Sequence, residues 1–126
     1  MKIINLTPHE VVLDNGFVHI SFPPSGNVAR IDPITERAAL EYSIATGVKI
    51  KLPVHQAPQV RVMNLPKEKQ GTFYIVSSYV AQAVKRKDLL APLTDGTATR
   101  DELGKVMSVK MFQQFTEQEI LEVQCV

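Results

Sequence analysis

The chain has 126 residues, 44% of them hydrophobic, and this length and composition predict one globular domain, residues 1–126, with a single core. Fourteen basic residues stand against thirteen acidic ones, and a net charge of +1 argues against a dedicated binder of nucleic-acid polymers. The one cysteine, Cys125, excludes an intrachain disulfide and a cysteine-based zinc cluster, so we expect a reducing, cytoplasmic location.

The first predicted element is a β-hairpin over residues 11–22. Two apolar segments flank Asp14-Asn15-Gly16, and Asn-Gly is the dipeptide that best accepts positive φ at both centres of a type I′ turn. Strand alternation then turns Val18, Ile20 and Phe22 toward the core and His19 toward solvent. A third strand is predicted over residues 28–31, closed by Asp32-Pro33.

The middle of the chain is predicted to hold a helix and then two strands. Residues 35–46 favour helix by propensity, with Leu40 and Ile44 four apart, until Gly47 ends it; a strand is the alternative for residues 35–44. Residues 48–52 and 60–62 alternate apolar with charged side chains, which is typical of half-buried strands joined in a second hairpin.

The last part of the chain alternates strand and helix signals. The run 73–76 is typical of a central strand, and Ser77 or Ser78 can cap a helix over residues 79–87. Residues 97–101 and 106–112 resemble a hairpin, and residues 116–119 have the spacing of a capping box that can start a helical turn through Leu121.

These elements together predict the fold class α+β, a compact, mainly antiparallel β domain with one or two short helices. No apolar run is long enough for a signal peptide or a membrane span, so we expect no membrane partner.

Residues that carry acid–base or metal chemistry are scarce. Of the three histidines, His9 lies in the Thr7-Pro8-His9-Glu10 segment, either as a ligand contact or as an ordinary turn residue, and His19 and His55 have no partners in sequence. No metal-ligand spacing is present, and Ser77-Ser78 lacks the glycines of a nucleophile elbow. We therefore expect neither a metal nor another cofactor, and no catalytic residue.

The sequence offers better candidates for residues that bind a phosphate or carboxylate group. A helix that follows a strand presents free backbone N–H groups, so Ser77 and Ser78 with the amides of Tyr79 and Val80 can hold an anion, although an ordinary cap has the same sequence. Guanidinium groups fork onto phosphates, and three arginines lie in or beside predicted strands, where the alternative is a solvated charge. These arginines are Arg30, Arg61 and Arg100.

Several short motifs follow one another in a recognisable order over nearly the full chain. They are Ile4-Asn5-Leu6-Thr7-Pro8-His9-Glu10-Val11, Pro23-Pro24-Ser25-Gly26, Ala29-Arg30, Asn64-Leu65-Pro66, the segment 71–77, Val80-Ala81, the segment 88–92, Arg100-Asp101 and Gly104. This order resembles a family of small uncharacterised proteins encoded by phages, prophages and bacterial chromosomes. The segment 36–44 is longer here than in that family.

This resemblance carries no known activity to any residue. Small phage proteins often counter host defence by sequestering nucleotide-derived signals such as cyclic ADP-ribose isomers or cyclic oligonucleotides. We therefore expect a non-enzymatic, homo-oligomeric binder of a small phosphorylated nucleotide ligand. The alternatives are a nucleotide-processing enzyme with His9 as base beside Glu10, and an inhibitor that docks on a host enzyme through an exposed sheet edge.

Overall fold

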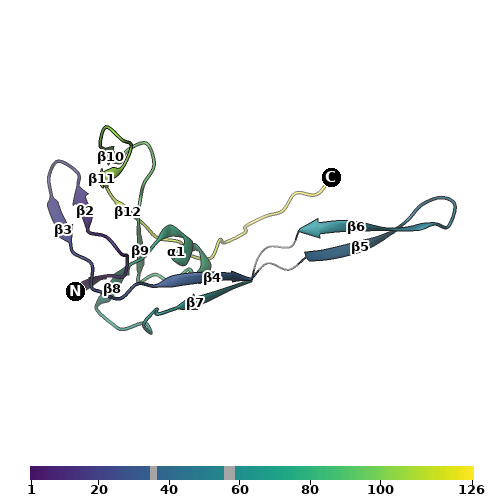
Figure 1. Cartoon of the computed structure of the whole chain (residues 1–126), viewed down its shortest axis with the longest axis horizontal. Coiled ribbons are helices and arrows are strands. Elements are labelled where there is room, and N and C mark those ends of the chain that lie inside the picture. Colours follow the sequence, from purple (N-terminus) through teal and green to yellow (C-terminus); the bar gives the residue numbers. More distant parts are fainter. Residues whose placement is uncertain (35–36, 56–58) are drawn as a thin grey trace. The chain divides into compact units, whose positions relative to one another are not determined.

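The computed structural model describes residues 1–34, 37–55 and 59–126, which form mostly strands and one short helix (Figure 1). Contacts divide the chain into a first unit, residues 1–30 with 62–126, and a second unit, residues 31–61. The single domain expected from length stays a prediction. In chain order the elements are β1 Lys2–Asn5, β2 Val11–Asp14, β3 His19–Phe22, β4 Arg30–Ile34, β5 Arg37–Ser43, β6 Lys49–His55, β7 Gln59–Met63, β8 Thr72–Ile75, α1 Ser78–Val84, β9 Leu89–Pro92, β10 Thr99–Arg100, β11 Val106–Ser108 and β12 Phe112–Gln113.

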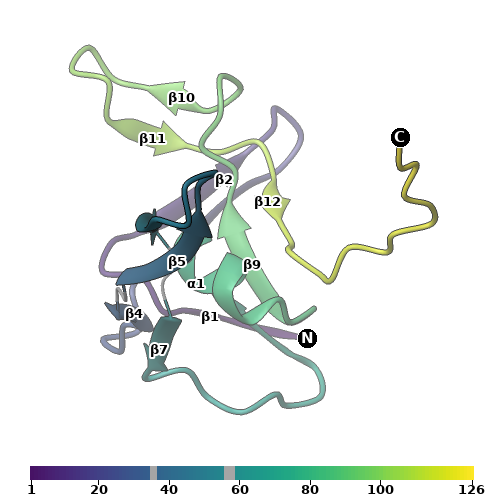
Figure 2. The same ribbon diagram turned by 90° about the vertical axis from the view of Figure 1, so that its right-hand side faces the viewer.

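The first unit is built on a four-stranded sheet in the order β1-β8-β9-β12. The β1–β8 and β8–β9 pairs are parallel, and only β9–β12 is antiparallel, so the expectation of antiparallel pairing is wrong for this sheet. Parallel neighbours need a crossover instead of a tight turn, and α1 supplies it between β8 and β9. Figure 2 shows α1 beside β9, against which it packs.

The core lies where β8, α1 and β9 meet. Ile75, Val76, Val80, Leu89 and Val109 are at most 2% exposed, which confirms the central strand predicted from the run 73–76. The helix is shorter than predicted because Lys85, with φ of 56°, takes the left-handed conformation and donates its N–H to the Ala81 carbonyl.

The predicted hairpin is confirmed as β2–β3, with Val11 opposite Phe22 and Asp14 opposite His19. Its turn is not type I′: four residues, 15–18, connect the strands, and Gly16 has positive φ whereas Asn15 does not. The Asn15 side chain accepts the N–H groups of Phe17 and Val18, which stabilises this longer loop. The prediction that Val18 and Ile20 face the core is wrong, since each is 42% exposed.

The described residues of the second unit form strands and a turn at residues 44–48, so the helix prediction for residues 35–46 is wrong in the described part. β5 pairs antiparallel with β6 over seven residues each, from Arg37 opposite His55 to Ser43 opposite Lys49. Pairing along this length overrides the helix propensity of Ala, Leu and Glu, which is worth only tenths of a kcal/mol per residue.

The strand order in this unit also differs from the prediction. β6 joins β5 and β7 joins β4, instead of β6 pairing with β7, and β4 continues through Asp32-Pro33, which was expected to close it. Residues 35, 36 and 56–58 of the predicted helix and connection lie outside the described residues.

At the C-terminal end the predicted hairpin is confirmed as β10–β11, and the predicted helical turn after residue 116 is wrong. A capping box stabilises only a helix start, and Ile120 and Leu121, 73% and 88% exposed, bury no face that would hold the helix. Among the described residues, no helix has the length and apolar character needed to cross a membrane.

Candidate functional site

The motif Asn5-Leu6-Thr7-Pro8-His9 forms a turn organised by one buried amide. The Asn5 side chain is buried, and its Nδ2 donates to the carbonyl oxygens of His9 (2.8 Å) and Phe22 (2.9 Å). Its Oδ1 accepts the backbone N–H (2.9 Å) and the hydroxyl (2.7 Å) of Thr7. All the hydrogen-bonding capacity of the amide is thus used to fix the turn and to place His9.

The backbone on either side ties this turn to the core sheet. Leu6 N donates to the Ile75 carbonyl (2.8 Å) and Leu6 O accepts the N–H of Ala29 (3.0 Å), while Asn5 O accepts the N–H of Ser25 (3.0 Å). These backbone hydrogen bonds therefore fix the positions of two further sequence motifs, Pro23-Pro24-Ser25-Gly26 and Ala29-Arg30, beside the turn.

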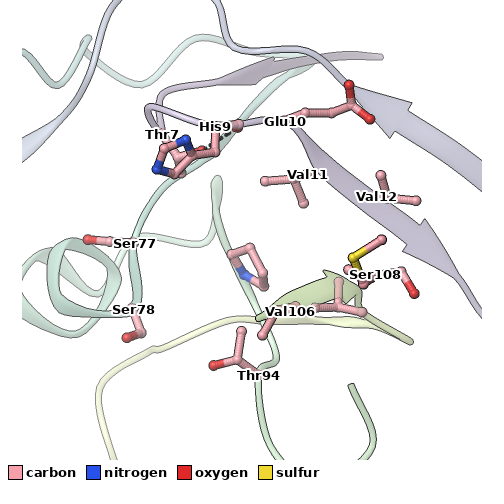
Figure 3. Close-up of a pocket in the computed structure, with 13 residues that line it drawn as sticks. Thr7, His9, Glu10, Val11, Val12, Ser77, Ser78, Thr94, Val106 and Ser108 are labelled. Atoms are coloured by element: carbon pink, nitrogen blue, oxygen red, sulfur yellow. Dashed lines mark hydrogen bonds between the residues drawn. The ribbon is translucent and has the colours of Figure 1, made fainter. Parts of the chain in front are cut away.

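A pocket of about 270 Å³ lies beside this turn, within the first unit (Figure 3). Its walls come from the turn, the start of β2, the start of α1, the end of β9 and β11. The lining residues are Thr7, His9, Glu10, Val11, Val12, Ser77, Ser78, Pro92, Thr94, Val106, Met107, Ser108 and Val109.

The pairing of β2 with the segment after β11 closes one side of the pocket. Asp14 N donates to the Val109 carbonyl and Val109 N to the Val12 carbonyl, both at 2.9 Å, so two chain segments about a hundred residues apart lie side by side. Val109 is buried, and Val11, Val12 and Val106 are half-buried, which makes this side apolar.

The structure brings together three of the residues expected to bind a ligand: His9, Ser77 and Ser78. Figure 3 shows the His9 ring and the two serines at the same side of the pocket, opposite Val106 and Ser108. Ser77 is also the helix cap, because its hydroxyl accepts the Val80 N–H at 3.3 Å. The Val80 amide, expected to be available to an anion, is therefore already paired.

The other expected residues do not line this pocket. Tyr79 is 70% exposed, Arg30 is exposed at the start of β4, and Arg61 lies on β7 in the second unit. Arg100 donates to the carbonyl oxygens of Gly104 (3.0 Å) and Thr94 (2.8 Å), so it fixes the loop that carries Thr94 instead of reaching a ligand.

Sequence reasoning missed most of the apolar wall and Thr94. Val106, Ser108 and Val109 were predicted as strand residues and nothing more, since no motif marks the bridge between Val109 and Leu13 of β2, which is remote in sequence. His9 and the serines were found because each is a rare residue type or stands at a strand-to-helix junction.

The electrostatics of the pocket are set by few groups. Glu10 and His9 are its titratable side chains, both exposed at the rim, and the described lining residues include no lysine or arginine. The hydroxyl groups of Ser78 and Ser108 supply uncharged donors and acceptors, whereas the Thr7 hydroxyl already donates to Asn5 and can only accept. Among the residues that the structure describes, no three metal-ligating side chains gather.

The shortest ion pair among the described residues, Arg86 with Asp88, lies outside the pocket. Arg86 donates from Nε (2.9 Å) and Nη2 (2.6 Å) to the two carboxylate oxygens of Asp88 and from Nη1 to the Pro66 carbonyl. The fork onto Asp88 raises the pKa of Arg86 and locks the segment between α1 and β9.

Comparison of the chain with family models, with curated proteins and with solved structures found no match. The resemblance to a phage-encoded family therefore stays a prediction, and the case for function depends on the pocket.

Proposed function

We propose that this protein captures a small nucleotide-derived molecule in the pocket between His9, Ser77 and Val106 and releases it unchanged. The single observation that carries the proposal is the pocket itself, which combines an apolar wall with hydroxyl and imidazole groups on the facing side. Small-molecule sites have this composition, with a mostly apolar lining and a few polar groups that fix the ligand's orientation.

Size and charge narrow the ligand class. A volume of about 270 Å³ is slightly below the roughly 300–1,000 Å³ typical of ligand sites, which favours a ligand no larger than a base with its ribose. Glu10 at the rim repels phosphate, and the described lining offers no lysine or arginine to meet it. A ligand with few phosphates, directed toward solvent, is therefore favoured, and a cyclic oligonucleotide is the weaker candidate.

In this proposal the base packs on Val11, Val106 and Val109, and the ribose hydroxyls pair with Ser77, Ser78 or His9. Binding of this kind lowers the free concentration of a signal without any chemical step. That role agrees with the anti-defence function expected from the resemblance.

A pocket-filling variant tests the site. Val106→Trp puts an indole into the pocket, and Leu103→Trp puts the same group on the same hairpin at a position that is 95% exposed. We expect thermal-shift and calorimetric binding of adenosine 5′-monophosphate or cyclic ADP-ribose to the wild type and to Leu103→Trp. Val106→Trp should lose this binding. A ligand at about 100 times its Kd should therefore stabilise the wild type and Leu103→Trp by roughly 2.7 kcal/mol and leave the stability of Val106→Trp unchanged.

Recovery of the ligand distinguishes capture from catalysis. The protein is incubated with the ligand, denatured by heat, and the supernatant analysed by mass spectrometry; intact ligand supports capture. Altered ligand would show an enzyme, with His9 as the candidate base, and His9→Ala would then stop the conversion. Equal affinity in wild type and Val106→Trp, or no binding of any nucleoside or nucleotide, overturns the proposal.

A further inference from the structure

The β5–β6 ribbon of the second unit has two faces of opposite chemistry. Leu40 lies opposite Leu52 and Tyr42 opposite Ile50, and the Ile44 N–H donates to the Val48 carbonyl at 2.9 Å. Successive side chains of a strand point to opposite faces, so these residues share one face. We name as the apolar ribbon face the side chains of Leu40, Tyr42, Ile44, Val48, Ile50 and Leu52, which are each 40–60% exposed.

The intervening residues make the other face polar. Glu41 lies opposite Lys51 and Ser43 opposite Lys49, and Lys49 Nζ is 3.3 Å from Glu41 Oε1. All the charged side chains of the segment 39–53 are therefore on one side, and the apolar ribbon face carries none.

β5 and β6, labelled in Figure 1, form a two-stranded sheet, and among the described residues no third strand pairs with either of them. An isolated two-stranded hairpin is marginally stable in water and needs a further strand or a packed face to hold it. A continuous apolar surface of this extent on a soluble fold marks an interaction site.

We infer that the apolar ribbon face is a self-association surface, on which a second copy of this chain packs its own apolar ribbon face. At the observed exposure each of the six residues presents on the order of 100 Å², so two copies would bury at most roughly 1,200 Å² in total, which reaches the roughly 1,000 Å² that a specific interface needs only if nearly the whole face is covered.

The chemistry of the face favours a second copy over a different protein. Homodimer interfaces are more apolar than transient ones, and a two-fold axis brings a patch against itself, so a patch without charges is self-complementary. Face-to-face packing at about 10 Å leaves Glu41, Lys49 and Lys51 in solvent and buries no unpaired charge. This inference is independent of the pocket in the first unit.

The test places charge on the apolar ribbon face without disrupting the ribbon. Leu40→Lys with Leu52→Glu exchanges a cross-strand apolar pair for a pair of opposite charge, which keeps strand pairing favourable while making the face polar. The control is Ala39→Lys with Ser43→Glu, which adds the same two charges to the polar face and sets the new carboxylate opposite Lys49.

Mass is measured by light scattering and sedimentation between about 1 and 100 μM, a range that spans the affinities expected of an interface of this size. Wild type and control should have twice the 14.0 kDa of the chain, and the Leu40→Lys/Leu52→Glu variant should be monomeric, with a dissociation constant at least about 100-fold higher. Amide NMR spectra of the variant should change mainly between residues 37 and 55.

Three outcomes overturn the inference. A monomeric wild type shows that the face does not bind a second copy, and a stable complex with a different protein shows another partner. A variant that keeps the wild-type mass shows that copies associate elsewhere, for example through the open edges of β5 and β6. If the amide NMR spectrum of the double variant shows loss of folded structure, Tyr42→Lys, which changes a single position, replaces it. Tyr42→Lys should then be monomeric, and a dimeric mass overturns the inference.

Discussion

Replacing Asn5 by alanine removes four hydrogen bonds from one buried side chain, two that it donates and two that it accepts. A hydrogen bond contributes a net 0.5–1.5 kcal/mol or so, and the groups left behind at Thr7 and His9 can reach water, so we expect a loss of roughly 2–4 kcal/mol. Since domains of this size are stable by only about 5–15 kcal/mol, the loss is a large fraction of the whole.

Urea unfolding followed by circular dichroism measures this change, and a fall of roughly 10 °C in Tm is expected alongside it. Asn27→Ala, at an exposed asparagine of the same unit, is the control and should change stability by less than about 0.5 kcal/mol. The reasoning is refuted if Asn5→Ala is as stable as the control, because water would then replace the hydrogen bonds of the amide without loss of stability. Ligand binding should weaken together with stability, since Asn5 positions His9.

Three further changes probe the core, the ion pair and the hairpin. Ile75→Ala, at a side chain with no exposed surface, should lower the free energy of unfolding by about 2–5 kcal/mol in urea titrations, and a loss below about 1 kcal/mol would mean that the site collapses around the gap. Arg86→Lys keeps the charge but not the fork onto Asp88, so we expect a loss of about 1–2 kcal/mol in urea, and no change would show that a point charge suffices. The backbone N–H of Gly16 lowers the pKa of Asp14 below 3.8, so its contribution to stability is present at neutral pH and lost as the pH falls through that lowered pKa. NMR titration of the Asp14 carboxyl checks this, and a midpoint at or above 3.8 contradicts it.

Several features of this protein could be predicted from residues close together in sequence. Asp14-Asn15-Gly16 between two apolar segments predicted the β2–β3 hairpin, and Ser77 after a β-branched run predicted the junction of β8 and α1. The same local evidence found His9 and the two serines of the pocket. These signals work because turn and cap chemistry is satisfied by hydrogen bonds that reach only two or three residues along the chain.

Tertiary structure alone decided the rest. The parallel pairing of β1 with β8 joins segments some 70 residues apart, and the apolar wall of the pocket exists because Val109 pairs with Leu13, donating its N–H to the Val12 carbonyl. The segment 37–43 is strand because β6 pairs with it over its full length. Intrinsic propensity cannot anticipate the stabilisation that this pairing provides. Contacts between remote segments depend on which surfaces the whole chain can bury together, whereas local patterns record only what each segment prefers by itself.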